Sequence, residues 1–199
     1  TRSRFPVLAL LIVAAFCFLC CPGSNAASPA AYRAYSLGPA ISVAAVTADG
    51  KVFGTVSTGP GAQSAAYLSA AAPATLVQTG YAWSEAASAA GTWEAVNAQA
   101  SPGKTFGLRR SNGGAWSKLQ AASGHTAAKA LKIDIDGTVY GWTFGKVSGK
   151  STYCAAVWKP GSGAPQIVST AGAEAIGAAP GGILVRVRKT TAASAGSLV

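Results

Sequence analysis

The stretch from Leu131 to Thr170 reads LKIDIDGTVYGWTFGKVSGKSTYCAAVWKPGSGAPQIVST and contains four short β-type runs separated by turn-forming residues. Leu131, Ile133 and Ile135 alternate with polar residues, and this period-two pattern predicts a half-buried strand. The later runs are rich in β-branched and aromatic residues, which favour strands. Asp136-Gly137 predicts a type I′ hairpin turn, in which both central residues adopt positive φ. The predicted strands span residues 131–136, 138–144, 152–158 and 166–169, with loops at 145–149 and 160–163.

The same order of strands and turns recurs along the chain. Similar runs lie at residues 43–46, 51–56, 65–68 and 75–77, then at 85–89, 93–97, 105–108 and 116–119, and a partial copy lies at 175–188. The expected turn glycines are Gly50, Gly91, Gly137 and Gly182, at intervals of 41, 46 and 45 residues. Four strands per repeat at this spacing are typical of propeller blades. The alternative is a chance similarity between segments rich in glycine and alanine.

We therefore predict an all-β fold of four-stranded antiparallel repeats of about 45 residues each. About three blades plus a fragment of a fourth would form a partial β-propeller, which would follow an N-terminal signal helix. A β-sandwich also has short strands, but its hairpins need not recur at a fixed interval.

Two pairs of segments carry a resemblance to a known family. Residues 50–54 (GKVFG) precede 65–68 (AAYL), and residues 137–141 (GTVYG) precede 155–158 (AAVW). Together with residues 35–38 (YSLG), which fit the family's lead-in strand, these segments resemble the HAF repeats, a family of bacterial extracellular repeats. The asparagine pair of the family's hairpin is replaced here by Asp-Gly or Gly-Gly. The resemblance implies a secreted or surface β-propeller-like protein and carries no catalytic residues.

The N-terminal residues are typical of a secretory signal peptide. Arg2 and Arg4 precede an apolar run over 5–21, and Ser24-Asn25-Ala26 offers small residues at a cleavage site. We predict a signal peptide at Thr1–Ala26, with a retained membrane anchor as the alternative. A small-residue linker at 27–34 and a β-repeat domain at 35–199 would follow, and we expect that domain to be truncated at its C-terminus. The expected location is extracellular or at the cell surface.

Charge limits the classes of partner. The chain has 16 basic and 6 acidic residues, for a formal net charge of +10. A basic surface on a secreted protein suits anionic polysaccharides or cell-envelope components. Ordinary solubility charge is the alternative, since no run of five basic residues exists. No nucleic-acid-binding motif is present, so we expect no nucleic acid partner. We also expect no membrane partner once the signal peptide is cleaved.

Residues for catalysis are sparse. The chain has a single histidine, His125, and lacks the short motifs of hydrolases, metalloproteases and phosphate-binding loops. Asp134 and Asp136 are two residues apart and could act as metal ligands on one face of a strand. Calcium needs six to eight oxygen ligands, and the neighbouring residues do not supply the others. We therefore interpret this pair as part of a hairpin turn. Cys154 is the one cysteine beyond the predicted signal peptide, and we expect it to be buried. We predict no catalytic residue, no metal site and no cofactor.

Aromatic and basic side chains are the remaining candidates for ligand contact. Exposed flat aromatic rings beside polar groups stack on sugars, whereas the alternative is that these large rings pack between the repeats. The candidate contact residues are Trp116, Tyr140, Trp142, Arg109, Arg110, Arg186 and Arg188.

Three functions fit these observations. The first is a non-enzymatic binding module for anionic polysaccharide or envelope components. The second is the propeller part of a secreted carbohydrate-active enzyme whose catalytic residues lie beyond Val199. The third is a structural component of an extracellular matrix. In each case an unpaired strand at the end of the repeats would favour self-association edge to edge.

Overall fold

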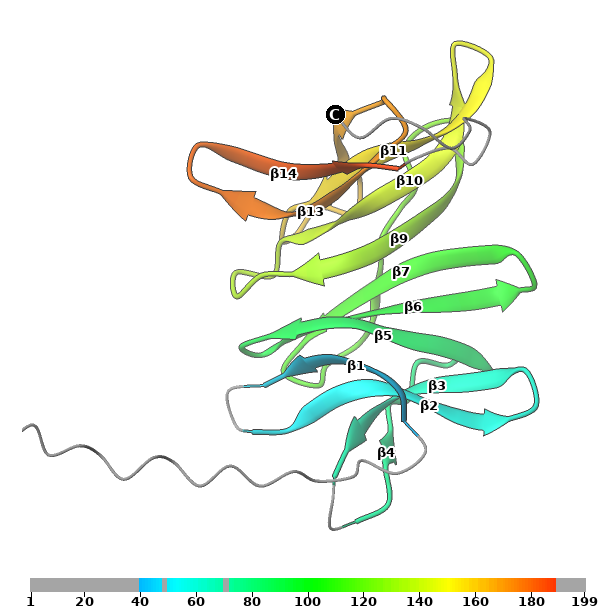
Figure 1. The fold of residues 1–199 in the computed structure, drawn as a ribbon, viewed down its shortest axis with the longest axis vertical. Helices are drawn as coiled ribbons and strands as arrows, with labels where there is room; N and C mark the ends of the chain where they lie inside the picture. The colour runs from blue at the N-terminus through cyan, green and yellow to red at the C-terminus, as the bar shows by residue number, and fades with distance from the viewer. Residues whose placement is uncertain (1–39, 48–49, 70–71, 189–199) are drawn as a thin grey trace, which may run out of the picture. The chain divides into compact units, whose positions relative to one another are not determined.

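The computed structural model describes residues 40–47, 50–69 and 72–188, and every regular element in these ranges is a β-strand (Figure 1). The strands are β1 (Ala40–Val46), β2 (Val52–Gly59), β3 (Ala62–Leu68), β4 (Thr75–Leu76), β5 (Trp83–Ala90), β6 (Trp93–Ser101), β7 (Lys104–Ser111), β8 (Ser117–Lys118), β9 (His125–Ile133), β10 (Val139–Val147), β11 (Lys150–Trp158), β12 (Gln166–Ser169), β13 (Ala173–Ala179) and β14 (Gly182–Val187). The predicted all-β class is confirmed.

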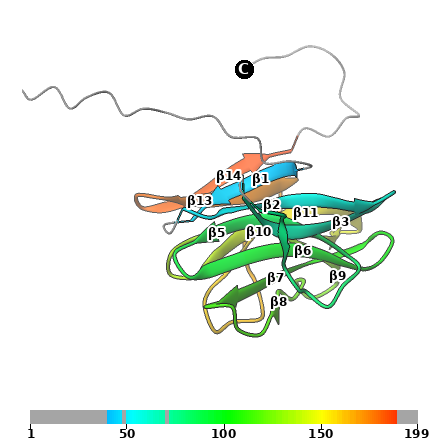
Figure 2. The same ribbon diagram turned by 90° about the horizontal axis from the view of Figure 1, so that it is seen from below.

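The strands form four antiparallel sheets whose order follows the chain. The first sheet contains β1–β4, the second β5–β8 and the third β9–β12, and the fourth contains the pair β13–β14. Figure 2 shows β8 beside β7 at the edge of the second sheet. Four-stranded antiparallel repeats are thus confirmed for the first three sheets. No sheet closes on itself within the described residues.

A β-bulge recurs at the same place in the first strand of every sheet. The unpaired residues are Ala44, Ala87, Leu131 and Ile176, which are 43, 44 and 45 residues apart. A bulge shifts the alternation of side chains by one residue. The predicted strand at 131–136 extends too far, because β9 ends at Ile133, which is buried, whereas Ile135 lies in the turn and is 78% exposed.

The bulge explains the second glycine of the GxVxG segments. Gly54 and Gly141 lie opposite the bulged strands, next to the unpaired residue. A Cβ atom on Gly54 would lie 2.3 Å from the carbonyl oxygen of Ser42, and one on Gly141 would lie 1.9 Å from that of Lys129. Only glycine tolerates this close approach of the neighbouring backbone.

The turn at Asp136-Gly137 differs from the predicted type I′ turn. Gly137 has positive φ, as expected, but Asp136 does not. Asp134 donates its N–H to the carbonyl of Thr138, which leaves a three-residue loop that ends in a left-handed glycine. The Asp136 carboxylate accepts hydrogen bonds from the N–H and the hydroxyl of Thr138, and these bonds stabilise the loop without a second positive φ.

Two further turns correct the sequence prediction. In the fourth sheet the left-handed glycine is Gly181 and not Gly182, because Pro180-Gly181 occupies the two central positions of the hairpin. In the third sheet, residues 145–149 are not a loop. Strands β10 and β11 stay paired until Ser148-Gly149, where both residues have positive φ and form the type I′ turn.

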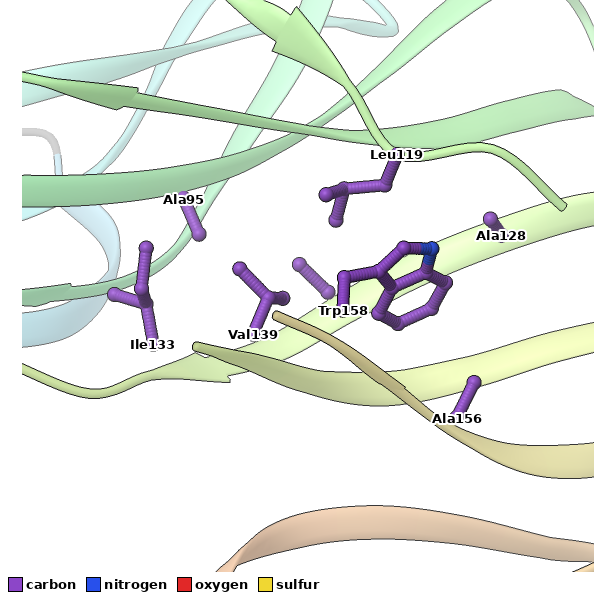
Figure 3. Close-up of a cluster of buried hydrophobic side chains, with 8 residues drawn as sticks. Ala95, Leu119, Ala128, Ile133, Val139, Ala156 and Trp158 are labelled. Atoms are coloured by element: carbon purple, nitrogen blue, oxygen red, sulfur yellow. The ribbon is translucent and has the colours of Figure 1, made fainter. Parts of the chain in front are cut away.

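Apolar clusters join consecutive sheets within the unit Ser36–Val199. The largest lies between the second and third sheets, where Ala95 and Leu119 meet Ile133, Val139 and Trp158. Figure 3 shows Leu119 reaching towards the Trp158 indole, which donates its N–H to the carbonyl of Gln120. Most of the buried side chains here are small, so the sheets approach closely and an added methyl group would disturb their packing.

Polar side chains also tie the backbones of adjacent sheets together. The Asn97 amide, which is 1% exposed, donates to the carbonyl of Ala130 and accepts from its N–H. Thr55 accepts the N–H of Ala86 in the same way between the first and second sheets. These bonds satisfy strand groups that would otherwise be buried without partners.

Several predictions lie outside the described residues. These are the signal peptide at 1–26, the linker at 27–34 and the lead-in strand at 35–38. The part of the chain that the structure describes contains no helix with the length and apolarity required to span a bilayer.

Candidate functional site

Arg109 is a packing residue and not a surface contact. Its side chain is buried, at 5% exposure, on β7 of the second sheet. The guanidinium donates to four carbonyl groups at the strand ends and turns of the third sheet, those of Gly137, Trp158, Lys159 and Ser162, at 2.8–3.2 Å. Burial lowers the pKa of Arg109, but arginine keeps its charge at any physiological pH. Arg109 therefore fastens the third sheet to the second.

Arg110 and Trp116 belong to a separate cluster. The Arg110 guanidinium lies 4.4 Å from the Trp116 ring centroid and donates from Nε to Glu94 at 2.7 Å. The Tyr67 hydroxyl from the first sheet donates to the same Glu94 carboxylate. Trp116 in turn donates its indole N–H to the carbonyl of Gln78. The charge of Arg110 is thus largely balanced within the protein.

Tyr140 is buried, at 5% exposure, in the apolar cluster between the third and fourth sheets. Burial, together with a hydrogen bond and the charge of Asp134, raises the pKa of Tyr140 to about 12. A ring in this position offers no free face for a ligand, so Tyr140 has a packing role.

Trp142, Arg186 and Arg188 come together at the fourth sheet. The Arg188 guanidinium lies 4.1 Å from the Tyr153 ring centroid and 5.6 Å from that of Trp142. Arg186 donates to the buried carboxylate of Glu174 at 2.6 Å. Arg186 therefore pairs within the fourth sheet, whereas Arg188 contacts the aromatic rings of the third sheet. The seven predicted residues do not form a single site.

An open cleft between the second and third sheets is a candidate site. Its volume is about 490 Å³, within the range of ligand pockets, and Phe106, Leu119 and Ala128 form its apolar floor. Lys104 and Lys118 line its rim. The Lys118 ammonium lies 4.2 Å from the Phe106 ring centroid. We call this hollow the lysine cleft.

Two turns place the lysines. Pro102-Gly103, with Gly103 at positive φ, reverses the chain between β6 and β7 and puts Lys104 at the start of β7. Asn112 and Gly113 both have positive φ and form a type I′ turn before the short strand β8, which carries Lys118.

No protein-family model, curated protein or solved structure matches this chain.

The charges of the lysine cleft are not compensated. Within the described residues, neither Lys104 nor Lys118 lies within ion-pair distance of a carboxylate, and no acidic residue lines the cleft. By contrast, Lys129 pairs with Glu85 at 2.5 Å and Lys132 with Asp134 at 3.1 Å. Two unpaired ammonium groups over an apolar floor favour a ligand that carries both anionic and apolar surface.

The groups that metal or thiol chemistry would use are occupied or separated. In the described ranges, no three His, Cys, Asp or Glu side chains are grouped to hold a metal ion. The hydrogen bond from the Thr138 N–H lowers the pKa of Asp136, and Asp134 is paired with Lys132. Cys154 is fully buried, as predicted, and burial raises the pKa of its thiol.

Sequence reasoning missed Lys104, Lys118 and Phe106 as site residues. Each is a single residue without a neighbouring motif, and the three come together only when β7, β8 and β9 are assembled. The sequence feature that could have indicated them is the Pro102-Gly103 turn directly before β7 and the Asn112-Gly113 turn a few residues before β8, which predict loops beside the two lysines.

Proposed function

We propose that this chain is a secreted or cell-surface protein that binds an acidic polysaccharide without catalysing a reaction. The observation that carries the proposal is the lysine cleft, in which two uncompensated ammonium groups flank an apolar floor. Uronic-acid polymers match this arrangement, since each sugar has a carboxylate and apolar C–H faces. The resemblance to extracellular HAF repeats and the excess of basic residues support the same class of ligand.

The binding test compares two polymers with the same backbone. Polygalacturonate should bind the protein in affinity electrophoresis or calorimetry, and its fully methyl-esterified form should not. Binding should weaken as salt rises, because exposed charges are screened. Duplex DNA is the control for charge alone. Equal binding of DNA and polygalacturonate would show a nonspecific polycation, and binding of neither would refute the proposal.

A double variant tests whether the lysine cleft is the site. Lys104→Ala with Lys118→Ala should weaken polygalacturonate binding by roughly tenfold or more, the size expected for lost charge-assisted contacts. Lys146→Ala with Lys150→Ala removes the same charge from the exposed end of the β10–β11 hairpin and is the matched control. Equal losses in the two variants would place the binding elsewhere.

We further propose that the sheets are blades of a β-propeller. The support is the regular bulge in each first strand, the meander order, and the packing of each first strand against the preceding sheet. An experimental structure should show β1, β5, β9 and β13 converging on a common axis. First strands without a common axis would contradict this arrangement.

Export is the remaining part of the proposal. The basic residues, apolar run and small residues of 1–26 support cleavage after Ala26. N-terminal sequencing or mass spectrometry of material exported from a bacterial host should find Ala27 as the first residue. Exported protein that keeps residues 5–21 would instead indicate an anchor.

A further inference from the structure

A second hollow adjoins the lysine cleft. Its volume is about 410 Å³, and its walls include Trp93 and Ser117 of the second sheet and Ser162 of the third. Lys118 lines both hollows. The two hollows therefore share one residue of the short strand β8, and we call the second one the serine hollow.

The connection from β8 to β9 lies beside both hollows. Leu119 lies on the floor of the lysine cleft, and the next residue, Gln120, donates its N–H to the carbonyl of Gly163 in the wall of the serine hollow. The carbonyl of Gln120 accepts the Trp158 indole N–H at 2.9 Å. These two hydrogen bonds hold the connection in place, and the Gln120 side chain is exposed on it.

The charges of the two hollows are of one sign. None of the described residues that line either hollow is acidic. Arg109 and Arg110 reach the serine hollow, but Arg109 is bound to four carbonyls and Arg110 to Glu94. The free positive charges are therefore Lys104, within the lysine cleft, and Lys118, at the junction.

We propose that the two hollows are subsites of one groove, and that an extended acidic oligosaccharide lies across β8 with Lys118 at its centre. This inference rests on the proposed function and specifies its ligand as a chain longer than one hollow accommodates. Carboxylates of successive sugars pair with Lys104 and Lys118. The sugar in the serine hollow lies beside Trp93, with Ser117 and Ser162 as hydrogen-bond partners for its hydroxyl groups.

The test is calorimetry with oligogalacturonates of increasing length. Affinity should rise with length until both hollows are filled and should then level off. Lys118→Ala should weaken the long oligomers by about tenfold, whereas Lys150→Ala, which removes an exposed charge elsewhere, should change them little. All substituted residues are exposed, and a thermal melt confirms that each variant keeps its fold.

Charge insertion separates the two subsites. Ala100→Glu places a carboxylate at the lysine cleft and should weaken oligomers of every length. Ala115→Glu places one at the serine hollow and should weaken only the long oligomers. An Ala115→Glu variant with unchanged affinity for long oligomers would overturn the continuous groove and leave a single-hollow site. Failure of the unmodified protein to bind any acidic chain would refute the proposed function itself.

Discussion

Arg109 shows how a charged residue can act as a structural fastener. Arg109 is next to Arg110 in the sequence, and from the sequence alone both residues are predicted to be surface charges. The structure separates their roles, since Arg109 faces the turns of the third sheet and Arg110 faces Glu94. Three of the four carbonyls around Arg109 belong to turn or loop residues, and the fourth belongs to Trp158, the last residue of β11. Sequence alone cannot reveal this role, because the acceptors are 28–53 residues away along the chain.

Removal of Arg109 should loosen the junction of the second and third sheets. Arg109→Ala removes the donor of four hydrogen bonds to carbonyl groups of the third sheet, and we expect a loss of roughly 2–5 kcal/mol in the free energy of unfolding. Urea denaturation measures this loss. Arg110→Ala, which removes a partly exposed ion pair, should cost less. A loss in Arg109→Ala no larger than in Arg110→Ala would contradict the fastening role.

Tyr140 should contribute to the loss of folding stability at alkaline pH. Burial raises the folded-state pKa of Tyr140 from 10.0 to about 12, so the native state favours the neutral phenol. The corresponding stability is complete below pH 10 and is lost as the pH rises towards about 12, since the unfolded chain releases the proton first. Unfolding free energies measured between pH 9 and 12 should fall, and the fall should be shallower in Tyr140→Phe. Identical slopes would show that other groups set the alkaline limit.

At the scale of the element, turn chemistry and periodicity predicted most strands but not their phase. Asp136-Gly137, Asn112-Gly113 and Pro160-Gly161 all marked real turns. The bulge at Leu131 could not be predicted from the sequence, because it arises from the pairing of two strands and no particular residue type marks it. The one sequence feature that is linked to this bulge is Gly141, on the strand that faces Leu131. The site escaped prediction for a similar reason, since its lysines converge only when neighbouring sheets pack.

The bulge makes Gly141 sensitive to a single methyl group. Gly141→Ala would set a Cβ atom 1.9 Å from the Lys129 carbonyl oxygen, so β9 must shift or its bulge must rearrange. We expect a loss of about 1–3 kcal/mol, the usual cost of overpacking. Gly182→Ala is the matched control, because nothing lies within 4 Å of its added Cβ and its φ is not positive. Equal thermal melts for the two variants would contradict the steric role of the bulge.

At the scale of the whole molecule, the principal contacts between the described sheets join sheets that are consecutive in the chain. Such an arrangement makes stability a sum of local terms and lets one repeat open while others stay folded. The fourth sheet is the clearest case, since it offers two described strands where the others have four. Its attachment depends on Ala173 and Ala175 in the apolar cluster and on the buried Glu174 carboxylate.

Loss of the Glu174 carboxylate should therefore release the fourth sheet selectively. In Glu174→Ala, Arg186 and Arg188 lose the acceptor that orients them, and Arg188 no longer has a nearby carboxylate to balance its charge over Tyr153. Amide hydrogen exchange should accelerate in β13 and β14, while β6 and β7 keep the protection of the unmodified protein. Arg186→Lys keeps the charge and is the conservative control, with a smaller expected change. Uniform acceleration in all four sheets would show that the molecule unfolds as one cooperative unit and would contradict stability built from local terms.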